Sequence, residues 1–416
     1  MFQSLLGILV FPVLAWVLGS RSKQVSWRLA LGALGLQIGL AILFVFTPGL
    51  RDLLAALNSV VLTLDQSTTK AAGFMFGYLA GAALPFEEIS PGGSFIVAFR
   101  VLPLIMVVSA ISAVLFHWGV LQRVVAGFAW LLKRVMGISG PLGFSASSTL
   151  FLGIIEAPLI VKPYLQKMRS SELLALMTCA MATVAGTVMV LYASVLEPVL
   201  PNAMGHILVA SAVSIPAALL MAHLHLPGEI GAESEEKMEI KVESQSTMDA
   251  LMRGTREGLE MCLQIAATII VLFALVHFFN AGLGLLPGEL TLERMVAWVF
   301  APIVWLMGIP AKEVMVAAEL MGTKTVLNEF VAYLNFASTS GAGLSETSRV
   351  IMVYAMCGFA NLGSLGILVG GLDAIIPERR KEVAALSFRA ILTGTLATCS
   401  TGALIGVLAH AGLVSL

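Results

Sequence analysis

The chain contains 416 residues, of which 58% are hydrophobic and only 12% are charged, and its formal net charge is −1 at pH 7. Because soluble domains carry about 25% charged residues, this composition excludes an ordinary soluble enzyme, and the balanced charge gives no reason to expect a nucleic-acid partner. Of the 24 basic and 25 acidic residues, thirteen lie between Glu229 and Glu260, and uncharged stretches recur through the rest of the chain. The sequence therefore predicts an all-α polytopic membrane protein.

Eight uncharged runs are long enough to cross a bilayer, which needs about 20 predominantly apolar residues. They cover residues 2–20, 29–50, 101–122, 173–196, 207–226, 261–288, 350–372 and 390–416. The first run lacks the basic start of a signal peptide, so we expect it to remain in the protein as a membrane span.

Two further apolar regions are interrupted too often to be simple spans. The first extends from Val135 through Glu156 and the second from Met295 through Glu329, and glycine, proline and serine break both. Hydrocarbon cannot satisfy the backbone groups that such breaks release. We therefore expect two re-entrant helical hairpins, around residues 140–168 and 309–340. Paired broken segments in the two halves of a chain indicate a transporter built from inverted repeats.

The same pattern divides the chain into four parts. Residues 1–95 are expected to form N-terminal scaffold helices and residues 96–222 a first repeat with its hairpin. Residues 223–254 are predicted to be a solvated charged linker. Residues 255–416 form a second repeat, with its hairpin, an unwound seventh helix and the last span.

Lysine and arginine gather in the turn after the first span, in the loop 227–260 and in the loop 377–383. Because basic loops stay on the cytoplasmic side of a membrane, we expect these loops to be cytoplasmic and both termini to lie outside.

Ionisable residues inside a membrane usually face a cavity or a pathway, which makes Glu156 and Glu329 the strongest functional candidates. The alternative is a glutamate at a helix end that is satisfied by backbone amides. The run GFANLGSLG (358–366) predicts local unwinding of the seventh span, so that Asn361 and Ser364 face solvent or substrate. Its glycines would also suit close helix packing. The four cysteines are isolated in apolar runs, which argues against a disulfide framework or a zinc site.

Four stretches carry a family resemblance, namely FRVLP (99–103), GIIEAPLIVKPY (153–164), TKTVLNEFVAY (323–333) and CGFANLGS (357–364). The chain resembles the concentrative nucleoside transporter family of bacterial type, essentially from end to end. The resemblance implies a homotrimer with eight transmembrane helices and two re-entrant hairpins per subunit. It also implies an elevator mechanism, in which a transport domain slides against a trimeric scaffold domain.

The resemblance assigns residues to the sugar of a nucleoside. Glu329 matches the family's ribose-binding glutamate, and Asn361 and Ser364 match its ribose-binding asparagine and serine. Phe359 and Val188 match positions that pack on the substrate.

The first hairpin departs from the family where it is expected to face the base. Glu156 matches the family's first-hairpin glutamate, but Ile154 and Ile155 stand where an amide and a hydroxyl are usual. Neither isoleucine can hydrogen-bond a pyrimidine edge, so the sequence predicts tolerance of several bases rather than selectivity for uridine.

The candidate ion site also differs from that of the family's sodium-dependent members. Thr149 and Thr183 stand where sodium-dependent members have an asparagine and a serine, with Leu152 and Val184 as possible carbonyl donors. Hydroxyl and carbonyl oxygens can still form a cage for a hard cation. A proton needs only one buried ionisable carrier, for which Glu156 is the candidate, so the coupling ion is either H⁺ or Na⁺, with the proton slightly favoured.

The sequence as a whole predicts a cation-coupled nucleoside symporter of the bacterial inner membrane, without an organic cofactor and without enzymatic activity. Three alternatives stay open. The first is a transporter for another ribosyl or polyhydroxylated metabolite. The second is an intramembrane enzyme that uses Glu156 and Glu329 as a carboxylate pair, against which stands the lack of any nucleophile, metal or phosphate motif. The third is a sensor that no longer transports.

Overall fold

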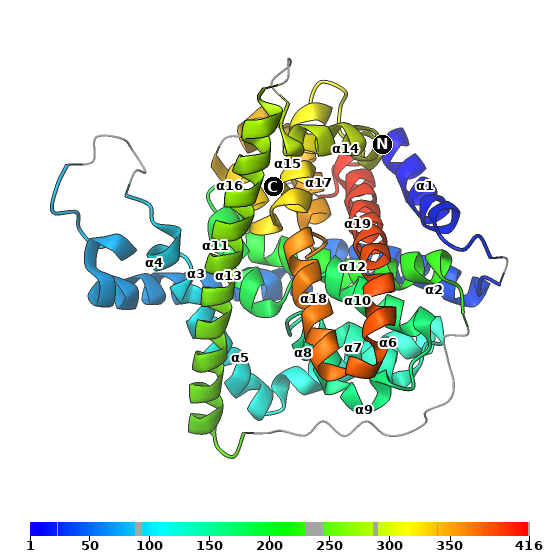
Figure 1. Cartoon of the computed structure of the whole chain (residues 1–416), viewed down its shortest axis with the longest axis horizontal. Coiled ribbons are helices and arrows are strands. Elements are labelled where there is room, and N and C mark those ends of the chain that lie inside the picture. The colour runs from blue at the N-terminus through cyan, green and yellow to red at the C-terminus, as the bar shows by residue number, and fades with distance from the viewer. Residues whose placement is uncertain (23, 88–93, 229–243, 286–289, 339, 415–416) are drawn as a thin grey trace.

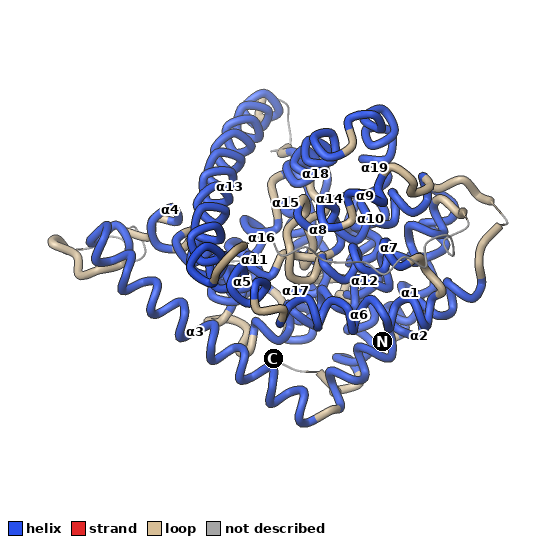
Figure 2. Tube along the Cα trace, turned by 90° about the horizontal axis from the view of Figure 1, so that it is seen from below, coloured by secondary structure: helices blue, strands red, loops and turns tan. Residues whose placement is uncertain are grey.

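The computed structural model describes the chain except for residues 23, 88–93, 229–243, 286–289, 339 and 415–416. Every regular element in the described residues is a helix (Figure 2), as the composition predicts. Residues 229–243 of the charged linker lie outside the described residues. The linker is shorter than predicted, because α12 extends to His225 and α13 already begins at Thr247.

The N-terminal part consists of α1 (Phe2–Leu18), α2 (Trp27–Phe46), α3 (Pro48–Phe76), the short helix η1 (Gly77–Ala80) and α4 (Val97–Arg100). The sequence analysis did not predict α3, because its charged residues interrupt every uncharged run in this part of the chain. In Figure 1, α3 and α4 project to one side of the main body.

The remaining helices form two series with the same order of elements (Figure 1). The first series is α5 (Pro103–His117), α6 (Val120–Met136), α7 (Gly140–Ser148), α8 (Glu156–Ile160), α9 (Lys162–Leu165), α10 (Ser170–Ala182), α11 (Gly186–Leu196) and α12 (Ala203–His225). The second is α13 (Thr247–Leu283), α14 (Leu292–Met307), α15 (Val314–Val326), α16 (Glu329–Ser338), η2 (Ser340–Gly343), α17 (Glu346–Met356), α18 (Leu362–Ile375), η3 (Pro377–Arg379) and α19 (Arg380–His410). Each series contains two single helices, a helical hairpin, a broken helix and a closing helix, which is the organisation of an internal repeat.

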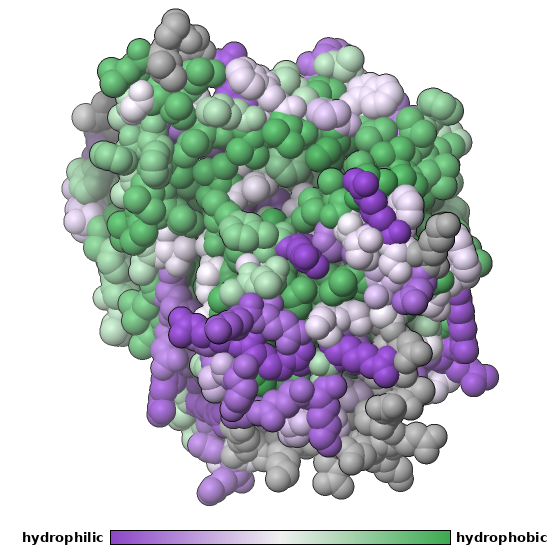
Figure 3. All heavy atoms as spheres, turned by 45° about the vertical axis from the view of Figure 1, so that its right-hand side comes forward, coloured by the Kyte–Doolittle hydropathy of each residue, from purple (hydrophilic) through white to green (hydrophobic). Residues whose placement is uncertain are grey.

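Six stretches of helix in the described residues are long and apolar enough to cross a membrane, and α1 and α18 are shorter apolar helices. All eight correspond to runs expected from the sequence. Figure 3 shows a broad hydrophobic band on one face of the molecule, with hydrophilic residues gathered below it.

In each repeat, a serine–glutamate hydrogen bond joins the chain just before the hairpin to the chain just after it. Ser139, before α7, donates to Glu172 in α10 over 2.7 Å. Ser345, before α17, donates through its hydroxyl to Glu313, before α15, over 2.9 Å. We call residues 140–165 hairpin 1 and residues 314–338 hairpin 2. The apolar segment that begins at Met295 belongs to the separate helix α14. Hairpin 2 therefore begins at Val314, after the start of the interrupted region described in the sequence analysis.

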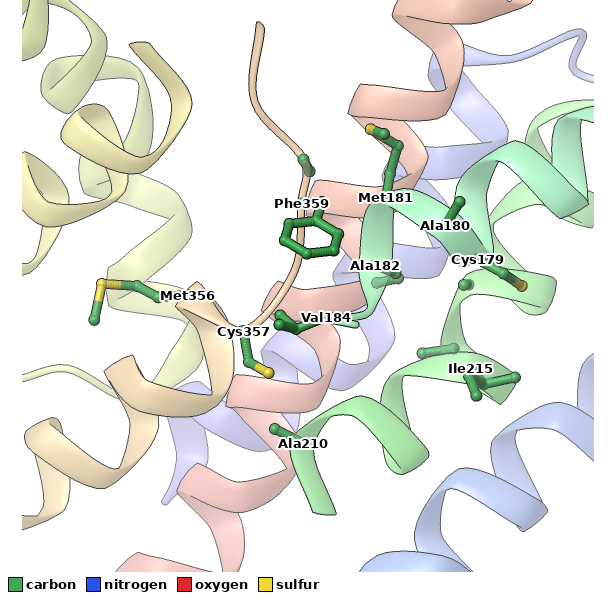
Figure 4. Close-up of a cluster of buried hydrophobic side chains, with 14 of the residues drawn as sticks. Cys179, Ala180, Met181, Ala182, Val184, Ala210, Ile215, Met356, Cys357 and Phe359 are labelled. Carbon is green, nitrogen blue, oxygen red and sulfur yellow. The ribbon is translucent and has the colours of Figure 1, made fainter. Parts of the chain in front are cut away.

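The breaks in the two interrupted helices lie against each other. The α10–α11 helix is broken at residues 183–185 and the α17–α18 helix at residues 357–361. The backbone N–H of Phe359 donates to the carbonyl of Thr183 over 3.2 Å. Figure 4 shows the buried side chains around this contact, among them Val184 and Cys357, neither of which is exposed to solvent. The break at 357–361 was expected from its glycines, whereas the first break was not.

Gly358 permits this close approach, and its replacement tests how far the fold depends on it. A Cβ at position 358 would lie 3.0 Å from the carbonyl carbon and oxygen of Ala182 and 2.9 Å from a methyl group of Thr398. Overpacking of this kind costs about 1–3 kcal/mol, so Gly358→Ala should lower the thermal unfolding midpoint of the detergent-solubilised protein by several degrees. Gly366→Ala is the matched control, because a Cβ there would meet no atom within 4 Å. Equal midpoints for the two variants would contradict the tight crossing.

Candidate functional site

A cavity opens between the tips of the two hairpins, the crossing of the broken helices and one face of α13. Its empty space amounts to about 840 Å³, open solvent included. Its lining residues are Gly153, Ile154, Ile155, Glu156, Ala185, Val188, Leu191, Tyr192, Met261, Gln264, Ile265, Thr268, Asn328, Glu329, Phe330, Phe359, Asn361, Ser364 and Ile367.

All eight residues that the sequence analysis assigned to substrate line this one cavity. Hairpin 1 contributes three of them, α11 and α16 one each, and the break before α18 together with the start of that helix the other three. Their separation in the chain reaches about two hundred residues, and the two repeats bring them together. The complete set is Ile154, Ile155, Glu156, Val188, Glu329, Phe359, Asn361 and Ser364.

Glu329 is the centre of a buried hydrogen-bond network. Tyr192 Oη donates to its Oε1 over 2.6 Å, and Asn361 Nδ2 donates to its Oε2 over 2.6 Å. Asn361 also caps α18, because its Oδ1 accepts from the backbone N–H of Ser364 over 2.7 Å. Glu329 is 4% exposed and Asn361 is fully buried. The network therefore fixes a carboxylate at the cavity wall, where it can accept hydrogen bonds from ligand hydroxyl groups.

Glu156 is held differently. It is the first residue of α8, and its carboxylate lies so close to the hairpin turn that a Cβ at Gly153 would collide with it. A glutamate at a helix end is the alternative to a functional role that the sequence analysis considered. Because Glu156 also lines the cavity, a ligand can reach its carboxylate.

The tip of hairpin 1 is apolar apart from that carboxylate. Ile154 is 9% exposed, and Ile155 packs so closely on Gly371 of α18 that a Cβ there would lie 2.6 Å from its Cγ1. The two isoleucines therefore offer a ligand shape and apolar surface but no hydrogen bond.

The four candidate ion ligands lie on two segments that touch. Gly186 N–H donates to the carbonyl of Phe151 over 3.2 Å, joining the turn of hairpin 1 to the break before α11. Thr149 donates its hydroxyl to the carbonyl of Ala146, and Thr183 donates its hydroxyl to that of Cys179. Each hydroxyl oxygen keeps lone pairs that a cation could use. The carbonyl of Thr183 accepts from the backbone N–H of Phe359. Leu152 and Val184 lie next in the chain to Phe151 and to Ala185, where hairpin 1 meets the break before α11. No cluster of three metal-binding His, Cys, Asp or Glu side chains occurs among the described residues.

Lys324 lies fully buried beside this site, although the sequence analysis assigned it no role. Its Nζ donates to the carbonyl of Ala355 over 3.1 Å and approaches Thr398 Oγ1 at 3.5 Å. Ala355 lies in the last turn of α17, where the carbonyl groups carry the negative end of the helix dipole. The ammonium group therefore satisfies backbone groups that the break in the helix releases.

Sequence reasoning missed Tyr192, Gln264 and Thr268, which line the cavity from α11 and α13. The signal was present, because each is an isolated polar side chain in an uncharged apolar run. Such residues in a membrane span usually face a polar partner or a pathway.

Comparisons with known proteins agree with the geometry. Residues 6–79 match the family model described as the N-terminus of Na⁺-dependent nucleoside transporters, and residues 206–406 match the model of their C-terminus. Residues 98–199, which include hairpin 1, match a model described as nucleoside recognition.

Individual relatives cover the whole chain. A nucleoside permease, NupC, of Helicobacter pylori is 30% identical over 98% of both chains. An uncharacterized transporter of Haemophilus influenzae is 32% identical over 100% of this chain and 99% of its own. The solved structure of CNTnw in an inward-facing, substrate-bound state is 33% identical, with a TM-score of 0.88 over 98% of both chains. A variant of CNTnw in an outward-facing state has a TM-score of 0.90 over 100% of this chain and 99% of its own, at 32% identity.

The bond from Tyr192 to Glu329 can be tested by its contribution to stability. A hydrogen bond to a charged group contributes about 1.5–3 kcal/mol and a neutral one about 0.5–1.5 kcal/mol. Tyr192→Phe should therefore lower the thermal unfolding midpoint more than Tyr333→Phe. Tyr333 is the matched control, since it is equally buried but donates to the backbone carbonyl of Val353 over 2.9 Å. Equal losses in the two variants would contradict an ionised Glu329.

Proposed function

The chain belongs to the concentrative nucleoside transporter family, and we propose that it is a cation-coupled symporter that takes up nucleosides. The observation that carries this proposal is the cavity, in which hairpin 2, the α17–α18 break and α11 hold Glu329, Asn361 and Tyr192 in one network. The apolar helices and the family identify a multi-pass membrane protein.

In the proposed complex, Glu329, Asn361 and Ser364 bind ribose. A carboxylate accepts hydrogen bonds from two sugar hydroxyls, while the remaining amide and hydroxyl groups supply donors and acceptors beside it. Phe359 and Val188 provide apolar surface in the same cavity. Because Tyr192 and Asn361 already orient Glu329, little ordering is needed when the sugar binds.

The base is proposed to lie toward the tip of hairpin 1, near Glu156. Since Ile154 and Ile155 discriminate only by shape, and apolar contacts separate related ligands by about 1–3 kcal/mol, several bases should be accepted. The same observation supports a second candidate substrate, another ribosyl or polyhydroxylated metabolite that uses only the sugar-binding residues.

Transport is proposed to follow an elevator mechanism in a homotrimer of the bacterial inner membrane. The family's solved structures in inward-facing and outward-facing states support alternating access. The basic loops are proposed to be cytoplasmic and the termini external.

Cation coupling is supported by the family, whose description names Na⁺. The ion itself is a separate part of the proposal. Thr149 offers a hydroxyl group where sodium-dependent members have the amide oxygen of an asparagine, a stronger ligand, which favours a proton with Glu156 as the carrier.

Substrate recognition through ribose predicts a specific loss. Glu329→Gln should weaken uptake of radiolabelled adenosine or uridine into proteoliposomes by roughly tenfold or more, because a buried sugar hydroxyl then lacks its charged acceptor. Glu319→Gln is the matched control, since Glu319 lies on the exposed side of hairpin 2. If 2′- and 3′-deoxynucleosides were taken up as well as ribonucleosides, the proposed ribose contacts would be wrong.

The coupling ion can be identified with imposed gradients. If protons drive uptake, it should rise as external pH falls, persist without sodium and collapse with a protonophore, and Glu156→Gln should abolish accumulation against a gradient. Uptake that requires sodium at constant pH, with a sodium requirement raised by Thr149→Ala and Thr183→Ala, would refute proton coupling in favour of sodium.

A further inference from the structure

We propose that the Gln264 side chain of α13 hydrogen-bonds the polar edge of the nucleobase, a contact that Ile154 and Ile155 of hairpin 1 cannot make. This inference rests on the proposed nucleoside transport and adds a specificity-determining residue to it. Gln264 is therefore expected to recognise bases that carry ring nitrogens and exocyclic amino or oxo groups.

Four residues of α13 face the cavity, namely Met261, Gln264, Ile265 and Thr268. Their spacing of three and four residues places them on a single side of the helix. Two of the four are apolar, so the polar surface that α13 offers to a ligand is limited to one amide and one hydroxyl group.

The amide of Gln264 has no hydrogen-bond partner within the described part of the chain. It occurs in an apolar span, where a polar group without a protein partner is costly unless water or a ligand satisfies it. Gln37 of α2 shows the other arrangement in this protein, because its buried amide donates to Ser400 over 3.4 Å. Gln264 instead lines the cavity and is exposed, which leaves its amide available to a ligand.

The course of α13 indicates which part of the ligand each polar residue meets. In the first half of the helix, Met261 Sδ accepts from Thr187 Oγ1 over 3.7 Å, beside the bond from Gly186 N–H to Phe151 of hairpin 1. Farther along, Val276 packs with Leu327 at the tip of hairpin 2. The helix therefore extends from one hairpin tip toward the other, and Gln264 lies between these two contacts.

Thr268 lies next to the proposed sugar site. A Cβ at Gly363, between Asn361 and Ser364, would be 3.3 Å from Thr268 Cγ2. Gln264 is four residues, or about 6 Å along the helix axis, closer to hairpin 1. Since ribose is proposed to bind at Asn361 and Ser364, this displacement places the Gln264 amide at the level of the base.

The chemistry of a primary amide fits the tolerance expected at this site. It has two donor hydrogens and an acceptor oxygen, so by rotating it can pair with the amino and ring nitrogens of adenine or with the oxo and imino groups of uracil. It would reject a base that presents no polar edge, because polar groups would then be left unpaired. A single amide at this position therefore accepts several natural bases and rejects purely apolar rings.

The test compares adenosine with indole riboside, which keeps the ribose and a fused ring but has no hydrogen-bonding group on the base edge. The kcat/KM ratio for uptake of these two compounds is measured in proteoliposomes. Gln264→Leu should lower the ratio of adenosine to indole riboside about tenfold, the effect of one lost hydrogen bond that leaves its partner unpaired. Gln264→Met, which keeps the unbranched shape, should give the same result.

Gln166→Leu is the control, because Gln166 is exposed and donates to Glu378 away from the cavity; its ratio should equal that of the unmodified protein. An unchanged ratio in both Gln264 variants, or an equal loss of uptake for both compounds, would overturn the assignment of Gln264 to the base. Absence of uptake of both adenosine and uridine by the unmodified protein would instead overturn the proposed function, and this inference with it.

Discussion

The structure depends on how backbone polar groups are satisfied where helices are interrupted inside a membrane. Hydrocarbon offers no hydrogen bonds, so each break needs partners from the protein. The breaks of α10–α11 and α17–α18 provide hydrogen-bond partners for each other, because the N–H of Phe359 donates to the carbonyl of Thr183. Lys324 satisfies the carbonyl of Ala355 at the end of α17. Polar side chains are needed where the breaks release backbone groups. This explains why the polar residues of the site gather where the two broken helices cross.

Asn361 combines two of these hydrogen-bonding roles. Its oxygen caps the new helix α18 and its amide group holds Glu329, so one side chain both stabilises the restart of the helix and orients the proposed sugar-binding carboxylate. A change at this position would affect the fold and the site together. Tyr192 is different, because its hydroxyl group donates to Glu329 without capping a helix. Tyr192→Phe therefore removes a bond to Glu329 and leaves the restart of α18 intact.

The sequence predicted the features that leave a compositional mark. Glycine, proline and serine interrupt apolar runs in both hairpins, and an asparagine among glycines marked the break at 357–361. The break at 183–185 left no such mark, since threonine, valine and alanine also suit a continuous span, and its contacts with Phe359 and with Phe151 of hairpin 1 arise only in the folded chain. Gln264 was hidden for another reason. Its role depends on which face of α13 meets the cavity, and that is decided by tertiary packing.

One wall of the cavity is formed by the hairpins and broken helices and the other by α13, and this division matters for transport. The broken helices pack on α12 and α19, hairpin 1 packs on α6 and hairpin 2 on α14, whereas α13 packs most extensively on α5. If the first group shifts relative to α13, as an elevator mechanism requires, then Glu329, Asn361 and Ser364 travel with the sugar while Gln264 stays behind. Contacts to ribose would then persist through the transport cycle, and the contact to the base would exist only in states where the two walls face each other. Selection of the base would therefore act at loading or release, because a contact that is lost during movement cannot set the affinity of every state.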